Sequence, residues 1–181
     1  RRQRQMCIRD SGGTGLLYRD QSKAEWATQM NMQGGITSVM NTSESTKFFN
    51  PAHPEVQTFL CDLLKDLAGY DLDGIFLDRG RFLNLQTDFS DESRKQFEAY
   101  MGGIKIQNYP EDILTPGASS LPTTYPKYMT KWLEFRAKVI YDFMQKARTA
   151  VKGVNSKIKF GVYVGGWYST YYCLLYTSDA A

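Results

Sequence analysis

A helix followed by a short apolar strand constrains the fold of this chain more than any other feature. Apolar side chains recur at every third or fourth position from residue 54 to residue 68, which predicts a helix with one buried face. Pro54 suits the first turn of this helix, and we expect Gly69 to end it in the left-handed conformation. Residues 74–77 (GIFL) follow, and a continuous apolar run of this length is typical of a parallel strand buried on both faces.

Asp78 lies directly after this strand and is the candidate catalytic residue. In α/β proteins the carboxyl ends of parallel strands carry the chemistry, so an acid at this place is well positioned for catalysis or for substrate binding. A structural role is the alternative, in which the carboxylate accepts loop N–H groups or pairs with Arg79 or Arg81.

The rest of the chain repeats the alternation of helices and strands. In chain order the sequence predicts a short helix at 24–30, a strand at 34–41, a helix at 90–101, a helix at 130–153 and a strand at 157–166. This order contains no hairpin signal and therefore favours βαβ crossovers and a parallel sheet. Residues 103–129 hold four prolines and little periodicity, and a loop of this length is usually functional or poorly ordered.

The helix and strand carry a family resemblance. Their segments NPAHPEV, LCDLLKDLAGY and DLDGIFLDRGRF resemble the signature of the glycoside-hydrolase-like family ten, and the resemblance extends roughly from Thr37 to Tyr172. It implies an α/β fold, a partial (β/α)8 TIM barrel of roughly three βα units with parallel strands. It also implies a carbohydrate-active hydrolase that acts on O-glycosidic bonds of a poly- or oligosaccharide, in a secreted or periplasmic location. Alpha-amylases have a comparable strand that carries an arginine where Phe76 stands and ends in the nucleophile.

Several residues are expected to surround Asp78 and bind the carbohydrate. If the sheet is parallel and in register, the strand ends bring Asn41, Asp78 and Trp167 to one rim. Trp167 and Tyr168 belong to an aromatic cluster on which apolar sugar faces can stack, although part of this cluster can equally serve the core. The substrate-binding residues predicted from the sequence are Asn41, Arg79, Arg81, Asn84, Trp167 and Tyr168.

A glycosidase needs a second carboxyl group across the scissile bond. Asp73 cannot supply it, because five residues of strand separate it from Asp78 by about 16 Å. We expect the proton donor to be a residue of a rim loop, such as Glu44 or Asp88, or to lie on a strand outside this chain.

The two ends of the chain affect every argument from length and charge. The chain has 181 residues, fewer than the roughly 250 of a full barrel, and its ends, RRQRQMCIRD and CLLYTSDAA, look like translated sequencing adaptors. We therefore expect non-native tails at 1–10 and 173–181 around a partial glycosidase-like barrel domain at 11–172. The tails carry net charges of +3 and −1, so the formal net charge of +3 falls to +1 without them and does not indicate a nucleic-acid partner.

The composition predicts no metal ion and no cofactor. Cys61 is the one cysteine outside the tails and His53 is the one histidine, so disulfide frameworks, His–metal sites and Ser–His catalysis lack their parts. No run of residues is long and apolar enough to predict a membrane span.

Two other functions stay open. One is a non-catalytic glycan-binding barrel, which would keep the aromatic rim and lack a pair of acids. The other is an open α/β sheet with a small-molecule site where the strand order reverses. A second carboxylate at a neighbouring strand end would favour the hydrolase over the glycan-binding barrel. The strand order would distinguish an open sheet from a barrel.

Overall fold

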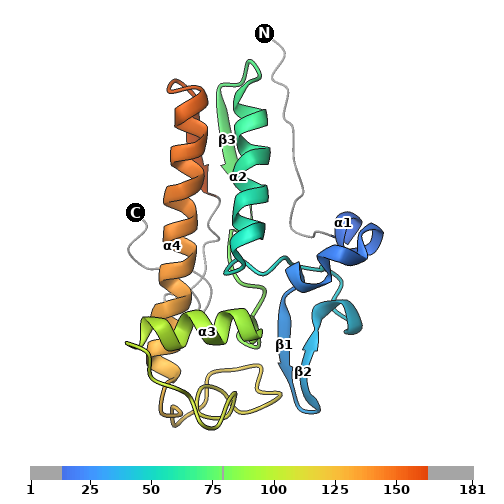
Figure 1. Ribbon diagram of the computed structural model, residues 1–181, viewed down its shortest axis with the longest axis vertical. Coiled ribbons are helices and arrows are strands. Elements are labelled where there is room, and N and C mark those ends of the chain that lie inside the picture. The colour runs from blue at the N-terminus through green and yellow to red at the C-terminus, as the bar shows by residue number, and fades with distance from the viewer. Residues whose placement is uncertain (1–13, 79, 163–181) are drawn as a thin grey trace.

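The computed structural model describes residues 14–78 and 80–162, which form a mixed α/β structure with two short sheets (Figure 1). The elements are α1 (Thr14–Arg19), the 3-10 helix η1 (Gln21–Trp26), β1 (Gln29–Met32), β2 (Gly35–Ser38), the 3-10 helix η2 (Val39–Asn41), α2 (Pro54–Ala68), β3 (Gly74–Leu77), α3 (Asp91–Tyr100), α4 (Met129–Val154) and β4 (Lys159–Val162). In Figure 1, α2 and α4 run side by side beside β3, and the β1–β2 hairpin and α3 lie at the other end of the described chain.

The strands β3 and β4 form the parallel pair that the sequence predicts. They pair in register from Gly74 opposite Lys159 to Leu77 opposite Val162. One face of this pair is covered by α2 and α4 through a cluster of buried side chains: Leu64, Ala68, Ile75, Phe143, Ala147, Val151 and Ile158. The expectation that β3 is buried on both faces is wrong for the described chain, because Phe76 on the opposite face is 71% exposed. Successive side chains of a strand point to opposite faces, which explains the difference from its neighbour Ile75.

The predicted strand at 34–41 is confirmed only over Gly35–Ser38, and it is antiparallel rather than parallel. The predicted helix at 24–30 is wrong over most of its length, because η1 ends at Trp26 and β1 begins at Gln29. Residues 29–32 and 35–38 form an antiparallel hairpin, β1–β2, in a sheet separate from β3–β4. Gly34 lies in the turn of this hairpin, and Gly35, with a positive φ of 114°, is the first residue of β2. The β1 segment is extended rather than helical because its other edge also has a partner: Asn31 N donates to Gln86 O at 2.9 Å.

The three longer helices confirm the periodicity argument, with corrections at their ends. One face of α4 is buried along its whole length, from Met129 to Val151. Ser90, at the start of the predicted helix 90–101, caps α3, and its side chain accepts a hydrogen bond from Ser93 N. Gly69 ends α2 as predicted, but the left-handed conformation expected for it is wrong, because its φ is −73°. The helix α4 begins at Met129, one residue before the predicted start at 130.

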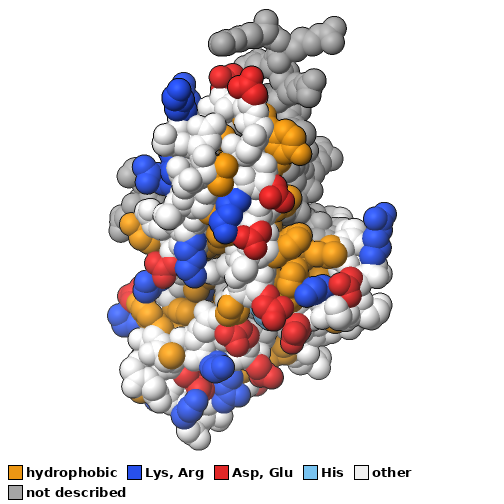
Figure 2. Space-filling view, turned by 45° about the horizontal axis from the view of Figure 1, so that its top comes forward, with side chains coloured by type: hydrophobic (Ala, Val, Ile, Leu, Met, Phe, Trp, Pro, Cys, Tyr) orange, Lys and Arg blue, Asp and Glu red, His pale blue; other side chains and the backbone are white. Residues whose placement is uncertain are grey.

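The long segment between α3 and α4 is packed into the core although it has no regular structure. Ile106, Ile113 and Leu114 are at most 2% exposed and share a cluster with Phe97 and Trp132. A functional or a poorly ordered loop was expected here, and the burial of these side chains shows a structural part of the core. On the surface in Figure 2, basic and acidic side chains are intermixed rather than gathered by sign. Within the described residues, no helix has the length and apolar character needed to span a membrane.

Candidate active site at the end of β3

Asp78 lies immediately after β3 and its side chain is exposed. The alternation of the strand places it on the same face as exposed Phe76, whereas Ile75 and Leu77 face α2 and α4. Among the described residues, none donates a hydrogen bond to the Asp78 carboxylate or forms an ion pair with it. The carboxylate is therefore accessible to a ligand at the carboxyl end of a parallel strand.

Asn41 is not brought to this strand end by the sheet that contains Asp78. It is exposed and ends η2, which follows the hairpin strand β2. The in-register argument for a shared rim required β2 and β3 to be parallel strands of one sheet, and the antiparallel hairpin removes that premise. Arg79, Trp167 and Tyr168 lie outside the described residues.

Arg81 and Asn84 lie in the loop that follows β3, and both are half-buried. Arg81 Nη1 donates to the carbonyl oxygens of Phe82 and Leu83 at 3.0 and 2.8 Å, and its guanidinium lies 5.7 Å from the centre of the Phe48 ring. Asn84 Oδ1 accepts a hydrogen bond from Gln86 N at 3.0 Å. Both side chains thus help to hold the backbone of the loop next to Asp78.

The expectation that Asp88 is a rim residue is wrong, because its side chain is fully buried. Its carboxylate accepts hydrogen bonds from six groups: Thr28 Oγ1 at 3.1 Å, Asn50 Nδ2 at 2.7 Å, Ser93 Oγ at 2.7 Å, Ser90 N at 3.2 Å, Ser90 Oγ and Gln29 N. Burial raises the pKa of Asp88 above its usual value, and these hydrogen bonds partly oppose the rise. Asp88 therefore ties β1, the segment before α2 and the start of α3 together, and it has no access to a substrate.

Glu44, the other rim acid considered as a proton donor, is half-buried in the loop between η2 and α2. Its backbone N donates to Thr42 Oγ1 at 3.3 Å, which shapes this loop locally. Lys47 closes the same loop from inside, because its Nζ donates to the carbonyl oxygens of Val39 and Thr42 at 3.0 and 2.9 Å.

Arg136 was missed by the sequence reasoning and holds the loop after β3 from α4. It is 3% exposed, and its Nη2 donates to Asn84 O at 2.8 Å while its guanidinium lies 4.5 Å from the centre of the Phe82 ring. Burial lowers the pKa of Arg136 to about 9, and the charge of Asp88 opposes this fall, so the side chain stays charged at neutral pH. The available signal was a single arginine on the apolar face of the helix, directly after Phe135.

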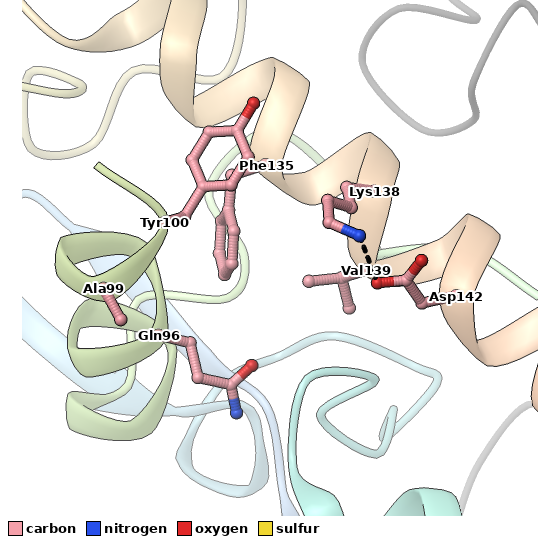
Figure 3. A pocket seen from close by; sticks show the side chains of 7 residues that line it. All are labelled: Gln96, Ala99, Tyr100, Phe135, Lys138, Val139 and Asp142. Carbon is pink, nitrogen blue, oxygen red and sulfur yellow. Dashed lines mark hydrogen bonds and ion pairs between the residues drawn. The ribbon is translucent and has the colours of Figure 1, made fainter. Parts of the chain in front are cut away.

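A pocket of about 280 Å³ lies between α3 and α4 and contains none of the predicted site residues (Figure 3). Its lining residues are Gln96, Ala99, Tyr100, Phe135, Lys138, Val139 and Asp142. Lys138 Nζ and Asp142 Oδ2 form an ion pair of 2.7 Å on its α4 side. In the described part of the chain, no group of three or more His, Cys, Asp or Glu side chains is arranged to hold a metal ion.

The comparison with protein families decides what kind of chain carries this site. The model of the family described as glycosyl hydrolase-like 10 matches residues 18–179. The chain belongs to this family. The match includes Asp78, the parallel pair β3–β4 and the helices that cover it, and it confirms the resemblance seen in the sequence.

A curated relative of this glycosyl hydrolase-like chain is an S-layer-related protein of Niallia circulans. The two are 32% identical over 163 residues, which cover 83% of this chain and 10% of that protein. The chain therefore spans about a tenth of the length of the relative it matches.

Proposed function

We propose that this chain is part of a carbohydrate-active glycoside hydrolase that cleaves O-glycosidic bonds of a poly- or oligosaccharide, with Asp78 as its catalytic carboxylate. The observation that carries the proposal is the exposed Asp78 at the carboxyl end of β3, in a chain of the glycosyl hydrolase-like 10 family. Parallel β3 and β4, covered on one face by α2 and α4, are what roughly two units of a (β/α)8 barrel wall would contribute.

The chemistry assigned to Asp78 is that of an ionised carboxylate beside an anomeric carbon. Such a group attacks that carbon in a retaining mechanism, or stabilises the positive charge that develops on the sugar ring. A retaining enzyme requires a second carboxyl group about 5–5.5 Å away, and an inverting enzyme requires a wider separation. Asp88 cannot be that group because its carboxylate is buried and fully engaged, so we assign the proton donor to another part of the protein.

The loop after β3 positions Asp78 for this role. Arg81 and Arg136 hold its backbone carbonyls, and the Asp88 network fixes its far end to β1 and α3. Arg81 and Asn84 are also retained as proposed substrate contacts, together with Asn41, Arg79, Trp167 and Tyr168. A secreted or periplasmic location is proposed with the glycosidase function, on the ground of the family resemblance alone.

The test is the substitution Asp78→Asn in the protein that carries this chain, assayed for release of reducing ends. The change keeps the shape of the side chain and removes its charge, so we expect turnover to fall at least about 10³-fold, which corresponds to about 4 kcal/mol of activation free energy. Asp73→Asn is the matched control, because Asp73 is an exposed acid at the other end of the same strand, and it should keep normal turnover. An Asp78→Asn variant with most of its activity would show that Asp78 is structural.

A non-catalytic glycan-binding protein is the second candidate function. The burial of Asp88 favours it, since this removes one of the two acids considered as proton donors. A parent protein that binds oligosaccharides with Asp78 intact, yet releases no reducing ends from any of them, would support this candidate over the hydrolase.

A further inference from the structure

The face of the β3–β4 pair opposite α2 and α4 carries an exposed aromatic ring. Phe76 is 71% exposed, which makes it the most exposed large apolar side chain in the described part of the chain. Its neighbours Ile75 and Leu77 point the other way into the cluster with α2 and α4. An apolar ring in water is unfavourable, so its position calls for an explanation.

Two glycines make room for this ring against the backbone of the sheet. Gly161 is the partner of Phe76 in the parallel register, and a Cβ atom there would lie 2.7 Å from Phe76 Cε1 and 2.8 Å from Cδ1. A Cβ atom on Gly74 would lie 3.4 Å from Phe76 Cε2. One edge of the ring therefore rests over Gly161 and the opposite edge lies near Gly74, which holds the ring across the two strands.

Any residue other than glycine at position 161 would have a Cβ atom that displaces the Phe76 ring. A separation of 2.7 Å between carbon atoms is far inside the 3.5–4.0 Å of an ordinary contact. Phe76 is nevertheless free on its outer side, so a side chain at 161 would displace the ring rather than disrupt the packing beneath α2 and α4.

Asp78 lies two residues further along the same strand, on the same face. Two residues of strand span about 6.6 Å, which is close to the width of one sugar ring. An apolar ring beside an exposed carboxylate matches the two sides of a pyranose: its C–H face packs on an aromatic side chain, and its hydroxyl groups donate to a carboxylate.

We propose that Phe76, seated on Gly161 and Gly74, is the platform on which one sugar ring of the carbohydrate ligand stacks beside Asp78. The proposal rests on the proposed function in that it uses the same site, and it adds the residue that positions the sugar. Phe76 binds and orients the sugar ring, and Asp78 remains the proposed catalytic carboxylate.

The test measures binding of three probes by the protein that carries this chain: hexasaccharides of α-1,4-linked glucose, β-1,4-linked glucose and β-1,4-linked N-acetylglucosamine, each titrated alone in a calorimeter. We expect Phe76→Ala to raise the dissociation constant of a bound probe about tenfold and Phe76→Tyr to leave it within about threefold of the parent. Gly161→Ala should raise it by a similar factor in the parent and should have no further effect in the Phe76→Ala variant, because the ring it displaces is then absent. Tyr70→Ala is the matched control, since Tyr70 is 63% exposed and lies before β3, and it should bind as the parent does.

Three results would overturn the platform. These are a parent protein that binds none of the three probes, a Phe76→Ala variant that binds as tightly as the parent, and a Phe76→Ala variant whose melting temperature falls while binding is unchanged. The last result would mean that more polypeptide covers the ring. The Asp78→Asn assay separates this outcome from failure of the proposed function. If Asp78→Asn loses turnover while Phe76→Ala binds the probes normally, only the platform is rejected. If Phe76→Ala binds the probes weakly while Asp78→Asn keeps normal turnover, only the catalytic assignment is rejected.

Discussion

Truncation of Asp88 tests whether one buried carboxylate holds three distant segments together. In the folded chain it accepts hydrogen bonds from β1, from the segment before α2 and from the first turn of α3. Asp88→Ala removes both oxygen atoms and leaves buried and part-buried donors without this acceptor. Two of the donors are backbone N–H groups that cannot rotate toward another acceptor, Gln29 N and Ser90 N. Asn50 Nδ2 also donates to Ser90 Oγ at 3.0 Å and so keeps one partner.

The magnitude follows from these two backbone groups. A buried donor left without a partner costs about 1–3 kcal/mol. The hydroxyl groups of Thr28, Ser90 and Ser93 can rotate toward other acceptors, and the removal of a buried charge offsets part of the loss. We therefore expect Asp88→Ala to lower the free energy of unfolding by about 2–4 kcal/mol. Asp88→Asn keeps one oxygen, and we expect a loss of about 1–3 kcal/mol.

The assay is denaturant unfolding, followed by the fluorescence of the buried Trp26 and Trp132. Asp91→Ala is the control, because Asp91 is an exposed acid three residues away whose loss should cost only the favourable helix-end interaction of about 0.3–1 kcal/mol. If Asp88→Ala is no more destabilising than Asp91→Ala, the Asp88 network does not hold these segments and the reasoning is refuted.

Two further predictions concern pH and backbone strain. Burial raises the pKa of Asp88 above the 3.8 of an exposed carboxyl, so above about pH 4 the folded chain keeps a proton that the unfolded chain has released. The free energy of unfolding should therefore fall as the pH rises from about 4 through the raised pKa. Unfolding curves of the parent should show this fall and those of Asp88→Asn should lack it, and equal slopes in the two proteins would contradict the prediction. Gly117→Ala should cost about 1–2 kcal/mol of stability, because Gly117 has a φ of 81° and a Cβ there would lie 3.1 Å from Gln33 Cβ. The helical Gly153→Ala, whose Cβ would meet nothing within 4 Å, should be neutral or stabilising under the same denaturation, and equal effects of the two substitutions would refute the strain.

The sequence by itself determined the elements whose signals are local. Helical spacing identifies α2, α3 and α4, because each buries a face made of residues only three or four positions apart. The apolar runs at 74–77 and 157–166 identified β3 and β4 in the same way, and with Asp78 they also carried the resemblance to a glycosyl hydrolase-like family that the family match confirms.

The tertiary structure alone decided which contacts a segment or side chain makes with distant parts of the chain. β1 is a strand because its edges meet β2 and the residues at 86–89, and no local spacing records the second of these contacts. Phe76 is exposed because the described chain covers only one face of β3, and it fits there because its partner across the sheet is Gly161. Asp88 follows a polar loop in the sequence and looks like a rim acid, yet donors from segments up to 60 residues away surround it. Its role depends on long-range hydrogen bonds, which are fixed only when the folded chain brings those segments together.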